Sequence, residues 1–296
     1  MQEIKIGVND AGQRLDRFLQ KHYETLTKSM MYKAIRNKKI KVNRKRCTYD
    51  QKLQEGDQIL IFLPLEFLNI RQKAKPINTG KIDVIYEDDD ILLVNKPSGL
   101  LSQSDQKGMQ DTLVNRIQYY LYQKKEYDPQ KENSFSPAIC HRLDKNTSGL
   151  VLAAKNARAL RLMNDAIAQH RIKKVYCAKI DGNINWDEKE ICCYIKKQDT
   201  KALVSRDQKP GYKKAEMFVK VIERQKESTL VDIVLKTGRF HQIRASLSFL
   251  GYPLCGDFKY GYKGKQKNYS LCAYHLEIGS IDLPIANKEF TIPVSF

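Results

Sequence analysis

A single aspartate in a basic turn is the residue of this chain best placed to do chemistry. Asp144 lies among Lys, Arg and small residues, between two apolar segments, 136–140 and 150–154, that are typical of short buried strands. Loops held by rigid strands commonly display functional side chains, and a carboxylate displayed there can act as a nucleophile or a base. The alternative is a turn aspartate that caps its own loop through Thr147 or Ser148. Spacing alone supports the two interpretations equally.

Five short motifs follow one another between residues 91 and 261. They are Val94–Leu100 (VNKPSGL), His141–Leu150 (HRLDKNTSGL), Lys174–Tyr176 with Ala178 and Gly182, Thr237–Arg244 (TGRFHQIR) and Gly251–Asp257 (GYPLCGD). In this order they resemble the NKP-x-G, HRLD-x-x-TSG, K-x-Y-x-A, TGR-x-HQIR and G-x-P-x-x-GD elements of the RluA-like class of pseudouridine synthases. Five elements in family order make the resemblance highly specific.

The resemblance implies roles for four side chains. Asp144 is the catalytic residue, Arg244 is its positive partner, and Tyr176 stacks on the target base and can take part in proton transfer. Arg142, on the same face of an extended segment as Asp144, contacts RNA beside the nucleotide that is flipped out of the stack. From the residues alone, Tyr176 is more typical of a core tyrosine. Likewise, the alternation of Gln242–Arg244 favours an exposed strand edge.

The implied reaction breaks the bond between N1 of uridine and the ribose, turns the base, and rejoins it through C5. No electrons or groups are exchanged, so we expect no cofactor. A guanidinium beside a carboxylate favours its charged form in a partly dry pocket. A glycosidase would need a second carboxylate, and the motifs predict none near Asp144, which favours isomerisation over hydrolysis. The residues leave open whether Asp144 attacks the sugar, adds to the base or deprotonates C2′.

Two residues depart from the family pattern. Phe240 stands where threonine is usual, and Asn146 stands where aspartate often occurs. Neither position carries the chemistry, so the expected reaction class is unchanged. The departures allow the loop that holds Arg244 to pack differently and a different RNA to be chosen.

The composition fits one or two globular domains. The chain has 296 residues, of which 42% are hydrophobic, and it contains neither an apolar run of membrane-spanning length nor an N-terminal signal-peptide core. We therefore expect a cytoplasmic protein that has no membrane partner and is a monomer. The seven cysteines include no C-x-x-C pair and are typical of free thiols. Five scattered histidines without an H-E-x-x-H pattern argue against a metal site.

The net charge of +18 indicates a polyanionic partner. Residues 1–75 carry 17 Lys and Arg against 8 Asp and Glu, a net of +9, and Lys28–Arg46 holds nine basic residues and no acidic one. Solvated charged surfaces normally mix both signs. The excess therefore predicts that this segment binds RNA.

The same segment has the element order of a small RNA-binding domain. Apolar spacing predicts a helix over 15–19, Ser29 is expected to cap a second helix, and strands are expected over 40–42 and 58–62. This order resembles the S4 RNA-binding domain, with Lys38-Lys39 in place of the usual glycine. The residues expected to contact RNA phosphates are Lys33, Arg36, Lys38, Lys39, Lys41, Arg44, Lys45 and Arg46.

The chain is predicted to divide into an S4-like domain over 1–65, a linker over 66–80 and a pseudouridine synthase domain over 81–296. The fold class is predicted as α+β: a small S4-like α/β RNA-binding domain followed by a large domain built on a mixed or antiparallel sheet. In the large domain helices are expected over 111–121 and 158–170, and strands over 82–86, 91–94, 215–222 and 230–236.

Three polar segments of the large domain are expected at its surface. The acidic stretch Glu87–Asp90 favours a solvated turn between two strands over a cation site. The insertion 123–134 and the basic loop 261–267 are expected to be surface loops that either touch RNA or have no role.

The predicted function is a cofactor-free isomerase that acts on structured RNA. Members of the class with this two-part layout generally modify large-subunit ribosomal RNA, alone or in an assembly intermediate, and transfer RNA is the alternative substrate. The competing class is a non-catalytic RNA-binding or ribosome-assembly factor. Asp144, Tyr176 and Arg244 together disfavour that class, because a protein that only binds RNA needs none of them.

Overall fold

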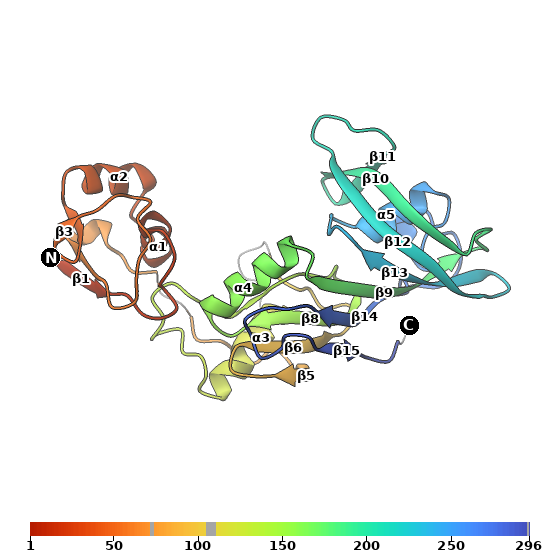
Figure 1. The fold of residues 1–296 in the computed structure, drawn as a ribbon, viewed down its shortest axis with the longest axis horizontal. Helices are drawn as coiled ribbons and strands as arrows, with labels where there is room; N and C mark the ends of the chain where they lie inside the picture. The colour runs from red at the N-terminus through yellow and green to blue at the C-terminus, as the bar shows by residue number, and fades with distance from the viewer. Residues whose placement is uncertain (72–73, 105–110, 295) are drawn as a thin grey trace.

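The computed structural model describes residues 1–71, 74–104, 111–294 and 296, which form two parts (Figure 1). Each part has its own apolar core or cores. The N-terminal core lies between Ile4 and Leu68, and the cores of the remainder lie between Ile91 and Ile292. The predicted α+β class is confirmed. The predicted linker, 66–80, begins inside the N-terminal core, which includes Leu68, and it contains 72–73, which are outside the described residues, so the domain boundaries stay predictions.

The small domain packs two helices against a four-stranded sheet of order β1-β4-β2-β3. The apolar stripe of α1, including Leu15 and Phe18, is fully buried. The predicted Ser29 cap is wrong: the N-cap of α2 is Thr27, two residues earlier, and its side chain accepts a hydrogen bond from the Met30 N–H at 3.4 Å. The elements are β1 (Gln2–Lys5), α1 (Leu15–His22), α2 (Lys28–Arg36), β2 (Ile40–Val42), β3 (Lys45–Arg46) and β4 (Gln58–Ile61).

The large domain is built on one mixed sheet whose main strand order is β11-β10-β12-β13-β9-β14-β8-β6-β5. The pairing of β14 with β8 is parallel, and the neighbouring pairs β8–β6 and β14–β9 are antiparallel. Its strands are β5 (Asp83–Glu87), β6 (Ile91–Lys96), β7 (Ala138–Ile139), β8 (Ser148–Ala154), β9 (Ile172–Asp181), β10 (Glu188–Gln198), β11 (Lys201–Ser205), β12 (Lys213–Arg224), β13 (Ser228–Leu235), β14 (Leu271–Ile278) and β15 (Glu289–Thr291).

Strands β6 and β8 are buried on both faces, which explains their unbroken apolar sequences. Leu92 and Val94 face the core that holds α3 (Leu113–Gln123), whereas Ile91 and Leu93 face the core that holds α4 (Ala157–Ala168). A strand with a helix on each side has no solvent face, so it cannot alternate between apolar and polar residues. The two strands form a rigid base for the loop between β7 and β8.

The other half of the sheet carries α5 (Gln242–Phe249) against β10 and β11. Strand β9 pairs with β13 on one side and with β14 on the other, so it joins the two halves (Figure 1). Side chains on β9 and α5 can therefore meet the loop that precedes β8.

The insertion over 123–134 contacts the small domain. Asp10, which is 2% exposed, accepts hydrogen bonds from Asn133 Nδ2 at 2.8 Å and from Ser134 Oγ at 2.6 Å. Gln13 Nε2 also donates to Ser134 Oγ at 2.8 Å. The expectation that this insertion either touches RNA or has no role was incomplete, because it serves as a hydrogen-bonded support for the small domain.

The acidic stretch after β5 is a turn, as expected. Asp88 accepts hydrogen bonds from the backbone N–H groups of Asp90 and Ile91, and Glu87 pairs with Lys124 and Lys155. Across the described part of the chain, no group of three or more His, Cys, Asp or Glu side chains is arranged to hold a metal ion. No helix within the same described ranges has the length and apolar character needed to cross a bilayer.

Candidate active site

The loop that carries Asp144 is held by backbone and buried side-chain contacts. Lys96 is fully buried, and its Nζ donates hydrogen bonds to the carbonyl groups of Pro97 at 2.9 Å, Leu100 at 2.8 Å and Lys145 at 3.0 Å. Burial lowers the pKa of Lys96 to about 8. One ammonium thus joins the NKP segment to the residue that follows Asp144. The sequence motifs did not predict this role for Lys96.

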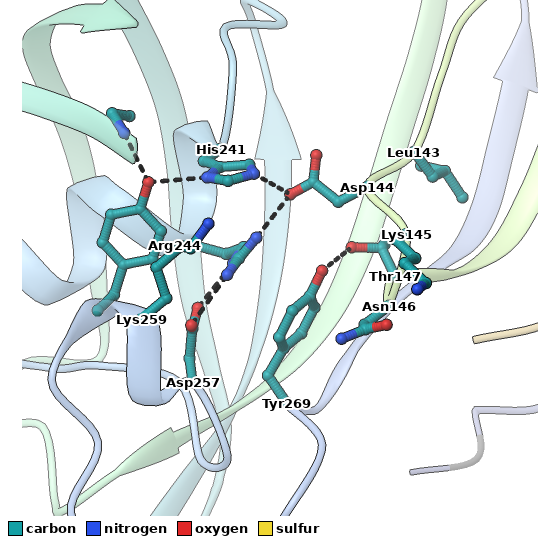
Figure 2. Close-up of polar contacts among 12 residues, drawn as sticks. Leu143, Asp144, Lys145, Asn146, Thr147, His241, Arg244, Asp257, Lys259 and Tyr269 are labelled. Carbon is teal, nitrogen blue, oxygen red and sulfur yellow. Dashed lines mark hydrogen bonds and ion pairs between the residues drawn. The ribbon is translucent and has the colours of Figure 1, made fainter. Parts of the chain in front are cut away.

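A second contact fixes the loop on the other side of Asp144. Ser102 Oγ donates to the Leu143 carbonyl at 2.6 Å and accepts from the Leu143 N–H at 3.1 Å. The loop closes through its backbone, because the Thr147 N–H donates to the Asp144 carbonyl at 3.1 Å, while the Thr147 hydroxyl contacts Tyr269. The Asp144 carboxylate points toward His241 and Arg244 (Figure 2).

Arg244 lies between two carboxylates (Figure 2). Its Nη1 donates to Asp144 Oδ2 at 3.2 Å, while its Nε and Nη2 donate to the two oxygens of Asp257 at 2.7 and 2.9 Å. Burial alone would lower the pKa of Arg244, but the hydrogen bonds to Asp257 and the surrounding negative charge raise it. The guanidinium also lies over the Tyr269 ring, 4.3 Å from its centroid. Its orientation is thus set by a bidentate ion pair and an aromatic face.

The exposed strand edge predicted for Gln242–Arg244 is wrong. These residues form the first turn of α5, and the Arg244 side chain is 8% exposed. The helix starts after His241, whose backbone is left-handed at φ 51°. Three residues span less than one helical turn, so the order polar, apolar, polar in Gln242–Arg244 fits the first turn of a helix as well as a strand.

The motifs predicted no second carboxylate near Asp144, but the structure places Asp257 there, bound to the same guanidinium. It is 1% exposed, and both its oxygens accept hydrogen bonds from Arg244. A carboxylate committed to a guanidinium in this way is not available to protonate a leaving group. A sequence signal existed, since buried aspartates are rare unless paired and Asp257 follows the apolar run Pro253–Cys255.

His241 lies beside Asp144 as a neutral imidazole. Its Nε2 is 3.7 Å from Asp144 Oδ2, and its Nδ1 is 2.8 Å from the Tyr260 hydroxyl. Burial lowers the pKa of His241 to about 4, so the contact with Asp144 is not an ion pair at neutral pH. Phe240, at the position of the usual threonine, stacks on His241 with ring centroids 3.8 Å apart. The departure therefore adds an aromatic surface next to Asp144.

Two cavities meet at Asp144. The larger, about 740 Å³, is lined by Asp144, Tyr176 and Arg244, and the smaller, about 430 Å³, shares Asp144 and Arg244 with it. Tyr176 is 6% exposed, and it packs in the central core as well as lining the larger cavity. It is therefore both a core tyrosine and a residue of the candidate site. Burial and the nearby Asp144 raise the pKa of Tyr176, which keeps its phenol protonated.

The predicted RNA contacts fall into two separate places. Arg142 is exposed and lines both cavities. The eight basic residues of the small domain lie on α2, β2, β3 and the segments between them, and none lines either cavity. All eight are exposed except Lys41, which is half-buried. The structure thus brings together Asp144, Tyr176, Arg244 and Arg142 and leaves the other basic residues on the small domain.

Comparisons with known proteins agree with this division. A family model for RNA pseudouridylate synthases matches residues 90–249, and an S4 domain model matches residues 13–59. An RNA pseudouridine synthase of Mycoplasma capricolum is 36% identical over 292 residues, which cover 96% of this chain and 94% of the relative. Ribosomal large subunit pseudouridine synthase C of Vibrio cholerae is 27% identical over 303 residues, which cover 100% of this chain and 90% of the relative.

A solved structure has the same fold. Human RNA pseudouridylate synthase domain containing 4 has a TM-score of 0.59 and 18% sequence identity, and the match covers 72% of this chain and 88% of that one. The synthase model spans over half of the 296 residues, and the Mycoplasma relative aligns over nearly the whole chain. The predicted resemblance and enzyme class are confirmed: the chain belongs to the RNA pseudouridylate synthase family, and it carries an S4 domain.

Proposed function

We propose that this RNA pseudouridine synthase modifies uridines of large-subunit ribosomal RNA and that Asp144 is its catalytic residue. The observation that carries the assignment of Asp144 is its position: a carboxylate, 26% exposed, bound to the buried Arg244 where two cavities meet. The ribosomal substrate is supported by the names of relatives such as that of Vibrio cholerae. Transfer RNA is the alternative substrate.

Asp144 and Arg244 supply the charge that the reaction needs. The N1–C1′ bond breaks, the uracil turns, C5 bonds to C1′, and the proton displaced from C5 leaves while N1 gains one. A carboxylate can stabilise positive charge that develops at the sugar, or attack it. The guanidinium keeps that carboxylate in place, and it is itself held by Asp257 on its far side. The proposal leaves the choice between attack on the sugar, addition to the base and C2′ deprotonation open.

Tyr176 and the aromatic residues near Asp144 provide the flat surface for the freed base. The phenol of Tyr176 stays protonated, so it can donate a hydrogen bond but does not act as a phenolate base. A uridine reaches this surface only when it is flipped out of its stack. Arg142, which is exposed and lines both cavities, is available to contact the RNA around the flipped nucleotide.

Mapping of pseudouridines tests the substrate. Large-subunit ribosomal RNA and transfer RNA are isolated from cells with and without the gene, and the pseudouridines in each are located chemically. The expected result is loss of one or a few ribosomal pseudouridines, restored by the wild-type gene and not by an Asp144→Asn gene. Loss confined to transfer RNA would replace the proposed substrate with the alternative.

A further inference from the structure

A histidine next to the catalytic loop has a buried donor without a partner. His141 Nε2 lies 3.2 Å from the Leu152 backbone nitrogen and accepts its N–H, so the ring proton is on Nδ1. Nδ1 is buried, and among the residues that the structure describes no group accepts its hydrogen bond. Buried donors are normally paired, because an unmade hydrogen bond costs free energy. His141 lines the larger cavity, so a ligand there can provide the missing acceptor.

A lysine in the same cavity also lacks a counter-charge. Lys174 lies two residues before Tyr176 on β9, so the two side chains point to the same face of the strand. Lys174 is half-buried, burial lowers its pKa, and within the described chain its side chain forms no ion pair or hydrogen bond. Its neighbour Lys173, on the other face, is exposed and pairs with Glu277 at 2.6 Å.

The two groups together select for an anion. Both are donors, one carries a positive charge, and the charge of Lys174 adds to the effect of burial in lowering the pKa of His141. An anion bound between them would complete the hydrogen bonding of His141 and compensate the partly buried ammonium. A neutral uracil carbonyl would satisfy His141 but leave Lys174 without a counter-charge.

We propose that His141 and Lys174 form a phosphate subsite of the larger cavity, which holds a backbone phosphodiester beside the target nucleotide. The inference rests on the proposed function, because it takes the base that stacks on Tyr176 as its reference point. Residues two apart on a strand are separated by about 6.6 Å, a step comparable to that between a base and the phosphate of the same nucleotide. Anchoring this phosphate would offset part of the cost of flipping the uridine.

The first test observes the histidine side chain directly. The ¹⁵N resonances of the five histidines are recorded on the full chain, and the His141→Gln variant identifies those of His141. Glutamine keeps an acceptor near the Nε2 position and removes the Nδ1 donor. We expect the Nδ1-H tautomer in the free protein and a shift of Nδ1 on addition of uridine 5′-monophosphate or inorganic phosphate. An equal shift with uridine, or no shift with any of the three probes, would overturn the proposal.

The second test measures the salt dependence of RNA affinity with matched variants. The probe is a transcript of large-subunit ribosomal RNA. Lys174→Met should reduce the slope of log affinity against log salt by about 1, whereas Lys174→Arg should keep the wild-type slope. Lys173→Met is the control, since Lys173 is exposed on the other face and already paired. An unchanged slope for Lys174→Met, or the same loss for Lys173→Met, would contradict the subsite.

Isomerisation by the wild-type chain is measured on the same transcript. If the wild type isomerises uridines and Lys174→Met keeps the wild-type slope of log affinity against log salt, the phosphate subsite is wrong and the proposed function stands. If the wild type isomerises no uridine in this RNA, the proposed substrate fails, whatever the slopes show.

Discussion

The exposed cations of the small domain and the buried cations near the Asp144 loop differ in what surrounds them. On the small domain, Arg36, Lys38 and Arg44 are exposed. In the large domain, Lys96 is fully buried against three carbonyl groups, and Arg244 is 8% exposed and bound to two carboxylates. The side chain of an exposed cation can change its conformation to contact a phosphate. A buried cation instead holds its hydrogen-bond partners in fixed positions.

Because of this difference in burial, we expect the exposed cations to affect mainly RNA affinity and the buried cations to affect mainly the rate of isomerisation. Loss of one exposed charge removes a single phosphate contact out of many and leaves the fold unchanged. Loss of a buried cation leaves its partners uncompensated and moves the reacting group. We therefore expect the effects on the rate of isomerisation to fall in order from Asp144, through Arg244 and Lys96, to the exposed residues of the small domain.

The largest effect is expected at Asp144. Asp144→Asn keeps the volume of the side chain and removes its charge, so isomerisation should be abolished while RNA affinity stays within a few fold of the wild type. Release of tritium from uridine labelled at C5 measures the reaction, and filter binding measures the affinity. Measurable turnover by this variant would show that another group is catalytic.

The next effect concerns the guanidinium between the two carboxylates. Arg244→Met removes a charge-assisted hydrogen bond to Asp144 and leaves Asp257 buried without a cation. We expect the single-turnover rate to fall about 100-fold or more and the free energy of unfolding to fall by about 3–5 kcal/mol. Chemical denaturation and single-turnover kinetics below the melting temperature measure the two quantities.

A double variant separates the two consequences of losing Arg244. Asp257→Asn added to Arg244→Met removes the uncompensated buried charge, so stability should largely recover while the rate stays low. If the rate recovers together with stability, Arg244 acts only by supporting the fold. If neither recovers, Asp257 has a role beyond holding Arg244.

A smaller effect is expected from the proton on Lys96. Burial lowers the pKa of Lys96 to about 8. Below that pH the ammonium has three N–H groups for three carbonyls, and above it the neutral amine has only two. Because one of those carbonyls belongs to Lys145, the Asp144 loop should loosen as pH rises through about 8, and the single-turnover rate should fall about tenfold.

The control for this pH dependence is Lys96→Met. This variant should be slow at every pH and should lack the alkaline fall, because it has no proton to lose at that position. The single-turnover rate is measured for both proteins between pH 6 and about pH 10, with RNA at saturation. A wild-type profile that is flat through about pH 8, or a fall that Lys96→Met shares, would assign the pH dependence to another group.

Short-range patterns made much of this molecule predictable. The buried strand β8 after Asp144 follows from continuous apolar residues, and α1 follows from an apolar stripe. The short buried strand predicted over 136–140 is wrong in length and burial, because β7 has only two residues and both are half-buried. The geometry around Arg244 depends instead on contacts between residues 13 and 100 positions apart, with Asp257 and Asp144. No local pattern encodes such contacts. The family resemblance therefore named Arg244, the alternation of Gln242–Arg244 suggested an exposed strand, and Asp257 was given no role.

The smallest effect on the rate is expected from the exposed cations of the small domain. Lys45 and Arg46 form β3, both are exposed, and neither lines a described cavity. Replacing both with glutamine should lower the slope of log affinity against log salt by up to about 2, while the single-turnover rate at saturating RNA stays within about twofold. The control is Lys220→Gln with Lys226→Gln, which removes two exposed charges from the large domain. An equal loss of slope in both double variants would mean that the chain binds RNA through its overall charge. The exposed basic residues of the small domain would then not form a specific RNA-binding surface.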